Sequence, residues 1–363
     1  MTANSKPKRI KYIDVAKGIG IVLVLVGHTG FIPQMLKQFI YAFHMPLFFV
    51  LAGFLMAVKG EAGKDLKSVI LHKAKGLLVP YVIFSVLYLI VSFIEIKAGV
   101  VTDVSVAGNA IRSLFLYGDS VLWFLPCLFF AEAGGLFIAN YFGKNWQVIL
   151  TIALGLGFYL PILRGQDIFS KIGVMLNNGI PSAGNCLIML WMVLLRSGMM
   201  LVFLMAGYLC KDAIGRLSRV RRVPKILVAI VSLLATFGVS LLNQSSIDIK
   251  NINIGNPFLF ITGAMLGSVG IITLSMLLER VRILRFWGRN SLIIMCTHLN
   301  LYVMYLAISW AWLVDRIVTH AKSYIFLANI MLATLIMESL IIIAVNKLGV
   351  IFTAKVKGPD RLG

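Results

Sequence analysis

Lys17 and His28 stand eleven residues apart in one strongly apolar stretch near the start of the chain, YIDVAKGIGIVLVLVGHTGFI. Charged and titratable side chains inside a membrane helix are costly and usually functional. At 1.5 Å of rise per residue, eleven residues of helix span roughly 16 Å, about half of a bilayer core. The basic N-terminus places Lys17 near the cytoplasmic face and His28 deeper, toward the other side. A cation at one level and a general-base candidate at another predict chemistry that crosses the bilayer.

A second histidine, His44, lies in the segment YAFHMPLFF, a few residues into the next apolar stretch. Because the two stretches are consecutive, their helices are antiparallel, and we expect His28 and His44 at one level in the outer half of the membrane. An imidazole accepts a hydroxyl proton near neutral pH, as general-base catalysis requires. A single membrane histidine more often makes only a helix–helix hydrogen bond, but two at matching depth favour a catalytic role. His298, in a later apolar stretch, fits either role equally well.

Acidic side chains are few in the apolar stretches. Glu132 fits a partner that orients or charge-balances a histidine, and equally a structural pair with Arg196. Glu338 fits a structural pair at least as well as a catalytic role. Asp14 precedes Lys17 by three residues, a spacing that also suits a simple ion pair on one helix face.

The basic segment His72-Lys73-Ala74-Lys75, at the inner start of the third apolar stretch, admits two interpretations. It anchors the topology, as basic loops do in most membrane proteins, or it binds a phosphate-bearing donor together with Lys17. The four cysteines are isolated in apolar stretches and form no ligand cluster with histidines, so no metal site is predicted.

Composition indicates the class of protein. The chain is 60% hydrophobic and 13% charged, with a mean hydropathy of +0.93, which is typical of a polytopic membrane protein. The net charge of +20 comes from short basic loops, so we expect no nucleic-acid partner. Ten apolar stretches are long enough to cross a bilayer, near 13–31, 39–58, 77–95, 121–140, 147–163, 186–209, 226–243, 257–278, 291–313 and 324–345.

The basic residues orient these helices. With the N-terminus inside, roughly three quarters of the 34 lysines and arginines fall in cytoplasmic segments, as the positive-inside rule requires. An even number of spans then puts both termini in the cytoplasm. We therefore predict an all-α polytopic membrane protein with about ten transmembrane helices. It forms a single integral-membrane domain over 1–363, with a basic cytoplasmic N-terminus at 1–12 and a basic cytoplasmic tail at 346–363.

Five segments occur in the order of one family along nearly the whole chain: YIDVAKGIGIVLVLVGH, FHMPLFFVLAGF, KAKGLLVPY, LWFLPCLF and FWGRNSLIIMCTH. Together they resemble the membrane-bound acyltransferase family 3, and look closest to the branch typified by fucose 4-O-acetylases. The resemblance implies a ten-helix inner-membrane enzyme that takes an acetyl group from cytoplasmic acetyl-CoA. The group passes to a hydroxyl of an extracytoplasmic or lipid-linked glycan.

The family's motif on the first helix is Arg, ten residues, then His. Here Lys17 takes the place of the arginine, while His28 matches. Lysine keeps the cation but lacks the bidentate guanidinium fork. By the resemblance, His28 is the base that activates an acceptor hydroxyl, and Lys17, Lys73 and Lys75 face the phosphates of CoA. The GRNSL segment, residues 288–292, matches a recurrent late motif to which the sequence assigns no role.

The sequence thus predicts an O-acetyltransferase of a bacterial cell membrane, multi-pass, with acetyl-CoA as donor substrate and no tightly bound cofactor. Its partners are acetyl-CoA, a surface or lipid-linked glycan and the lipid bilayer. A polytopic exporter of a glycan or lipid-linked sugar is the alternative. We expect a pocket bounded by the first three helices. The candidate residues are His28, His44 and Glu132 for catalysis, Lys17, Lys73 and Lys75 for donor binding, and Asp14, Arg196, Asn290 and His298 in support.

Overall fold

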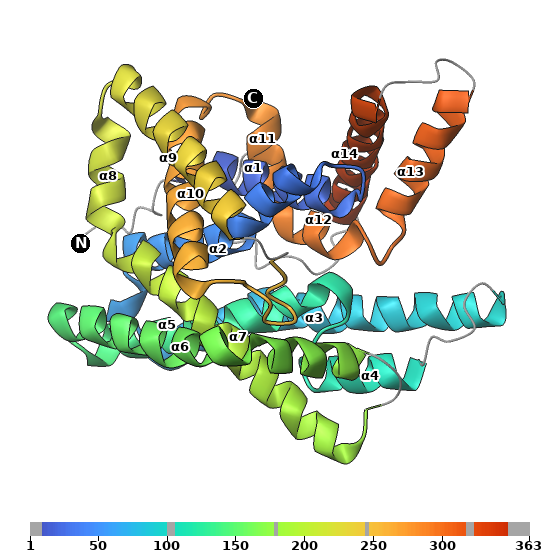
Figure 1. Ribbon diagram of the computed structural model, residues 1–363, viewed down its shortest axis with the longest axis horizontal. Helices are drawn as coiled ribbons and strands as arrows, with labels where there is room; N and C mark the ends of the chain where they lie inside the picture. Colours follow the sequence, from blue (N-terminus) through green and yellow to red (C-terminus); the bar gives the residue numbers. More distant parts are fainter. Residues whose placement is uncertain (1–8, 100–105, 178–180, 244–246, 317–322, 348–363) are drawn as a thin grey trace. The chain divides into compact units, whose positions relative to one another are not determined.

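The computed structural model describes residues 9–99, 106–177, 181–243, 247–316 and 323–347, and these are helical almost throughout (Figure 1). Among them the only β pairing is an isolated antiparallel bridge between Asp248 and Asn253. The prediction of an all-α polytopic membrane protein is confirmed. Residues 1–8 of the predicted N-terminal segment and 348–363 of the predicted tail lie outside the described residues.

Within the described ranges, eight helical segments are long and apolar enough to cross a bilayer. Helices span membranes because lipid offers the backbone no hydrogen-bond partner, so each N–H and C=O must be satisfied inside the segment. In chain order the eight are α2 (Gln34–Val58), α3 (Leu66–Lys97), η2 (Ser120–Trp123) joined to α5 (Phe124–Tyr141), α6 (Lys144–Asn177), α7 (Ala183–Leu209), α9 (Arg222–Leu242), α10 (Pro257–Leu277) and α14 (Ser323–Lys347).

The other two of the ten predicted spans differ from plain crossing helices. The first, α1 (Lys11–His28), is set apart by three charged side chains, Lys11, Asp14 and Lys17, within its 18 residues. The ninth, predicted over 291–313, is broken into α12 (Ser291–Thr297) and α13 (Val303–Val314). Tyr302 lies at the break with a φ of 60°. The remaining short helices are η1 (Glu61–Gly63), α4 (Val106–Leu114), α8 (Lys211–Arg219) and α11 (Arg282–Arg289).

The described residues form two compact units that alternate along the chain. The first unit takes its residues from Met1–Lys64, Phe130–Asn178 and Leu194–Leu292. The second takes them from Asp65–Phe129, Gly179–Val193 and Ile293–Gly363. The first unit therefore contains α1, α2, α6 and α8 to α11, and the second contains α3, α4, α13 and α14, whereas the residues of α5, α7 and α12 are divided between the two.

Close helix crossings build the first unit. Helix α1 packs against α2, α10 and α11, and α10 packs along α9. Helices α2 and α7 meet at their backbones, because a Cβ on Gly53 would overlap with the carbonyl of Leu204, and one on Gly207 with the carbonyl of Val50. Small residues at such a crossing let membrane helices approach closely and gain van der Waals contact. Helix α2 is thereby fixed by α1, α10 and α7.

In the second unit, side chains from other helices support the break between α12 and α13. The Tyr88 hydroxyl of α3 donates a hydrogen bond to the carbonyl of Cys296, near the end of α12. The Thr297 hydroxyl donates to the carboxyl of Glu338 on α14 at 2.7 Å. Irregular backbone at membrane depth is tolerated where protein groups of this kind satisfy it.

Candidate functional site

His28 of α1 and His44 of α2 both lie beside the ring of Tyr41. The ring centroids of His28 and Tyr41 are 6.3 Å apart, and those of Tyr41 and His44 are 4.8 Å apart. The two imidazoles can therefore lie no farther apart than the sum of these distances. The Tyr41 hydroxyl also donates to the carbonyl of Gly27 at 3.2 Å, which ties α2 to the end of α1. Both histidines thus contact the same tyrosine, and their catalytic role stays a prediction.

The backbone sets which nitrogen of each histidine can act as a base. The Nδ1 of His28 lies 2.9 Å from the carbonyl of Val24, and the Nδ1 of His44 lies 2.9 Å from the carbonyl of Ile40. A carbonyl oxygen can only accept, so Nδ1 carries the hydrogen and donates it. In the neutral ring the lone pair is then on Nε2. Each ring is oriented by its own helix with Nε2 as the basic nitrogen.

Two charged residues that the sequence analysis missed act on His28. They are Lys37, in the first turn of α2, and Asp248, in the loop between α9 and α10. Asp248 is held by Asn251, whose side-chain amide donates to its Oδ2 at 2.6 Å. Asn177, at the end of α6, in turn donates to Asn251 at 3.1 Å. The only signal in the sequence is the segment DIKNINIGN, which is rich in asparagine and lies between two apolar stretches.

At the other level of α1, Lys17 lies among four charged side chains. Lys59 and Arg9 repel it, whereas Asp14 and Glu132 attract it. Glu132, proposed from the sequence as a partner for a histidine, is thus within electrostatic range of the cation. Among the described residues, Lys17 takes part in no ion pair. The side chain is partly buried in this part of the protein.

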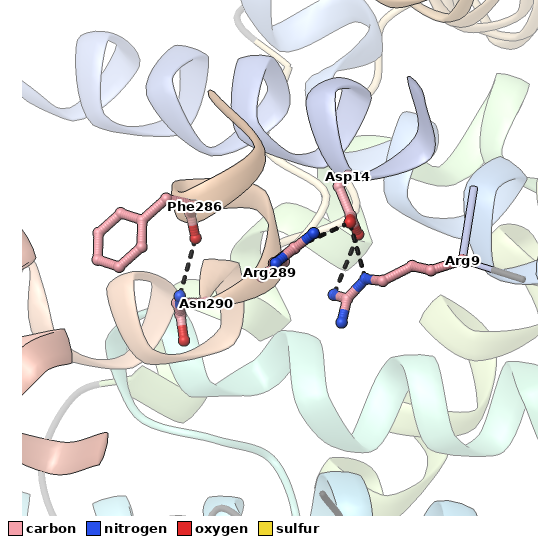
Figure 2. A network of polar contacts seen from close by, with 5 residues as sticks. All are labelled: Arg9, Asp14, Phe286, Arg289 and Asn290. Atoms are coloured by element: carbon pink, nitrogen blue, oxygen red, sulfur yellow. Dashed lines mark hydrogen bonds and ion pairs between the residues drawn. The ribbon is translucent and has the colours of Figure 1, made fainter. Parts of the chain in front are cut away.

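Asp14 pairs with two arginines instead of Lys17 (Figure 2). Arg9 donates to it twice, from Nε to Oδ2 at 2.7 Å and from Nη2 to Oδ1 at 3.2 Å. Arg289 of α11 donates from Nε to Oδ2 at 3.2 Å. The ion pair between Asp14 and Lys17, left open by their spacing, is therefore not the one that forms. Asn290, beside Arg289, donates to the carbonyl of Phe286 at 2.8 Å, within its own helical turn.

The crossing of α1 and α11 brings Arg289 to Asp14. A Cβ on Gly288 would overlap with the backbone carbonyl of Asp14, and one on Gly18 with the carbonyl of Leu284. Two glycines, one from each helix, thus let the backbones touch. The GRNSL segment, which the sequence left without a role, is the place where α11 and its arginine dock on the first helix.

Comparison with known protein families finds one family that covers nearly the whole chain. A family model described as an acyltransferase domain matches residues 10–345. The chain belongs to acyltransferase family 3. No curated protein and no solved structure matches it significantly. Membership makes the protein a multi-pass membrane acyltransferase, which acts between an acyl donor and an acceptor in contact with the bilayer. The fucose 4-O-acetylase branch stays a prediction.

The other candidate residues of this acyltransferase divide between the two units. Arg196 of α7 belongs to the first unit and is fully buried, with 0% of its surface exposed. His298 belongs to the second unit, also fully buried, and its Nδ1 donates to the carbonyl of Ile294 at 2.9 Å. Lys73 and Lys75 lie on α3 of the second unit, Lys73 half-buried and Lys75 exposed. Their role in donor binding, and the pocket expected between the first three helices, stay predictions.

Proposed function

We propose that this acyltransferase moves an acetyl group from cytoplasmic acetyl-CoA to a hydroxyl of an extracytoplasmic or lipid-linked glycan. The observation that supports it most is on α1. That single helix carries a cation without an ion-pair partner among the described residues, Lys17, and a histidine whose Nε2 is the basic nitrogen, His28. Eleven helical residues separate them, so an elongated donor would lie along α1 over roughly 16 Å.

In the proposed reaction, Nε2 of His28 removes the proton of the acceptor hydroxyl while the hydroxyl oxygen bonds to the thioester carbon. The carbon–sulfur bond breaks, and CoA leaves as the thiolate. The imidazolium then returns its proton to the sulfur, so that the products are the acetyl ester and CoA. General-base assistance of this kind contributes typically 10²–10⁴-fold to a rate. Tyr41 and His44, in ring contact with one another and next to His28, keep the base in place.

Lys17 is proposed to bind the phosphates of the donor. Phosphate groups are too polar to enter hydrocarbon, so they must stay at the cytoplasmic face and meet cations there. Lys73 and Lys75 are proposed to contribute to the same binding, as the family resemblance implies. Lysine supplies charge without the bidentate geometry of arginine, so donor affinity is expected to depend strongly on ionic strength.

The test uses the purified protein in lipid nanodiscs with acetyl-CoA labelled in the acetyl group. We expect CoA to be released and the label to appear as an ester on an added lipid-linked or surface glycan, by mass spectrometry. Transport of the glycan across a vesicle membrane without any gain in mass would instead support an exporter. Transfer of the label to an amine, or to no glycan in a broad panel, would contradict the proposed acceptor class.

A further inference from the structure

Asp14 and Lys17 are spaced so that they would normally pair. Residues three apart on a helix are neighbours, and opposite charges at that spacing attract one another. Such a pair would cancel the charge that the proposed donor site needs. In the structure, the Asp14 carboxylate is turned to Arg9 and Arg289, and both of its oxygens are used (Figure 2).

Arg289, the partner of Asp14 from α11, is held in place by a close backbone contact. The residue before Arg289 is Gly288, where an added Cβ would overlap with the backbone carbonyl of Asp14 itself. The Asp14 side chain is only 9% exposed, whereas those of Arg289 and Arg9 are 45% and 60% exposed. A carboxylate that is largely out of water needs a paired cation more than an exposed one does. If both arginines were absent, Lys17 would be one of the two lysines that stand three residues from Asp14 on the same helix, with Lys11 as the other.

We propose that Arg289, together with Arg9, is a positioning residue that holds the Asp14 carboxylate and so keeps the Lys17 ammonium available for the phosphates of the donor. The inference rests on the proposed function, because it concerns the same donor site. It assigns the GRNSL segment a role at the donor end of α1. Its effect is on donor affinity, since the acetyl transfer at His28 takes place roughly 16 Å farther along the helix.

The experiment is a cycle of variants in nanodiscs, with acetyl-CoA turnover for KM and kcat and calorimetric titration of CoA for Kd. The variants are R9Q/R289Q, D14N and the triple variant R9Q/R289Q/D14N. In R9Q/R289Q we expect KM and Kd to rise about tenfold, which corresponds to roughly 1.4 kcal/mol of donor affinity, with kcat at saturating donor nearly unchanged. D14N alone should change KM much less than R9Q/R289Q does, because the two arginines already neutralise its carboxylate. The triple variant should return KM close to the wild-type value.

Two matched variants complete the design. Arg282→Gln removes an exposed arginine from the same helix without touching Asp14, and its KM should stay at the wild-type value. Arg289→Lys keeps a cation within reach of Asp14 and should retain most of the donor affinity. Thermal unfolding of every variant identifies any that fail to fold.

The proposal is tested by whether the effects of the arginine and Asp14 substitutions on donor binding add. If the triple variant binds donor as poorly as R9Q/R289Q, the arginines act on the donor or the scaffold directly, and the proposal is overturned. If D14N lowers KM equally with and without the arginines, the effect is only summed charge, which also overturns it. A wild-type protein that binds no CoA at all would instead refute the proposed function.

Discussion

The contact between α1 and α11 predicts that a single methyl group at Gly288 will force the two helices apart. A Cβ at this position overlaps with the backbone carbonyl of Asp14 and comes within 2.7 Å of the amide nitrogen of Gly18. Neither neighbour is a flexible side chain that can rotate away. To restore a normal separation of about 3.5 Å, the helices must move apart by roughly 1.5 Å. The Arg289 Nε, now 3.2 Å from Asp14, would then lose its ion pair.

The expected free-energy change of Gly288→Ala is the difference of two effects. Overpacking costs about 1–3 kcal/mol, and the upper end applies because the obstacle is backbone. Alanine recovers about 1 kcal/mol over glycine in a helix. The net destabilisation is about 2 kcal/mol, which lowers Tm by roughly 4 °C in a protein larger than 150 residues.

The assay is thermal unfolding in detergent, followed by a thiol-reactive dye. Exposed Cys210 sets the baseline signal, and the signal rises when Cys127 and Cys296, both buried in the folded protein, become accessible. The control is Gly157→Ala on α6, which makes the same change where no atom lies within 4 Å of the new Cβ. Its Tm should stay the same or rise. A Gly288→Ala variant with the Tm and donor KM of the wild type would refute the backbone crossing and the docking role of α11.

Two further substitutions test other parts of the account. Lys17→Ala should raise the KM for acetyl-CoA about tenfold and reduce the dependence of donor affinity on salt. Lys17→Arg should keep the donor affinity, because it keeps the cation. Equal donor affinity in the wild type and both variants would contradict a donor role for Lys17. Thr297→Val should lower stability by about 1–3 kcal/mol, because it leaves the buried carboxyl of Glu338 without its donor. The matched control is Thr334→Val on α14, which removes a buried hydroxyl that bonds only to its own helix. Equal losses of stability in the two variants would argue against a special role for the Thr297–Glu338 hydrogen bond.

Hydropathy predicted most of the helices because the requirement for crossing a membrane applies to each segment separately. Each segment must satisfy its own backbone hydrogen bonds in lipid, so length and apolar composition alone indicate a span. The break at 298–302 could not be found in this way, since HLNLY contains neither proline nor glycine, and one histidine and one asparagine between apolar flanks do not by themselves end a span. The short basic helices α8 and α11 were missed for a related reason, because a search for long apolar stretches passes over them.

The site was predictable where it depends on neighbouring helices. His28 and His44 meet because consecutive antiparallel helices bring their connected ends to one level. The pair of Asp14 and Arg289 joins residues 275 positions apart, and no local pattern specifies which of many arginines will reach a given carboxylate. Only Gly288, a small residue next to Arg289 in a late motif, signalled a close contact, and it did not indicate with which helix.

The central claim, that His28 is the base for acyl transfer, is tested most directly by His28→Ala in nanodiscs. The measurement is transfer of labelled acetyl to glycan at saturating acetyl-CoA, alongside the Kd for CoA, with exposed His72→Ala as the matched control. We expect His28→Ala to lose at least roughly 100-fold in transfer, to bind CoA as the wild type does and to unfold at nearly the same temperature. His72→Ala should remain active. Transfer by His28→Ala at close to the wild-type rate would contradict the mechanism.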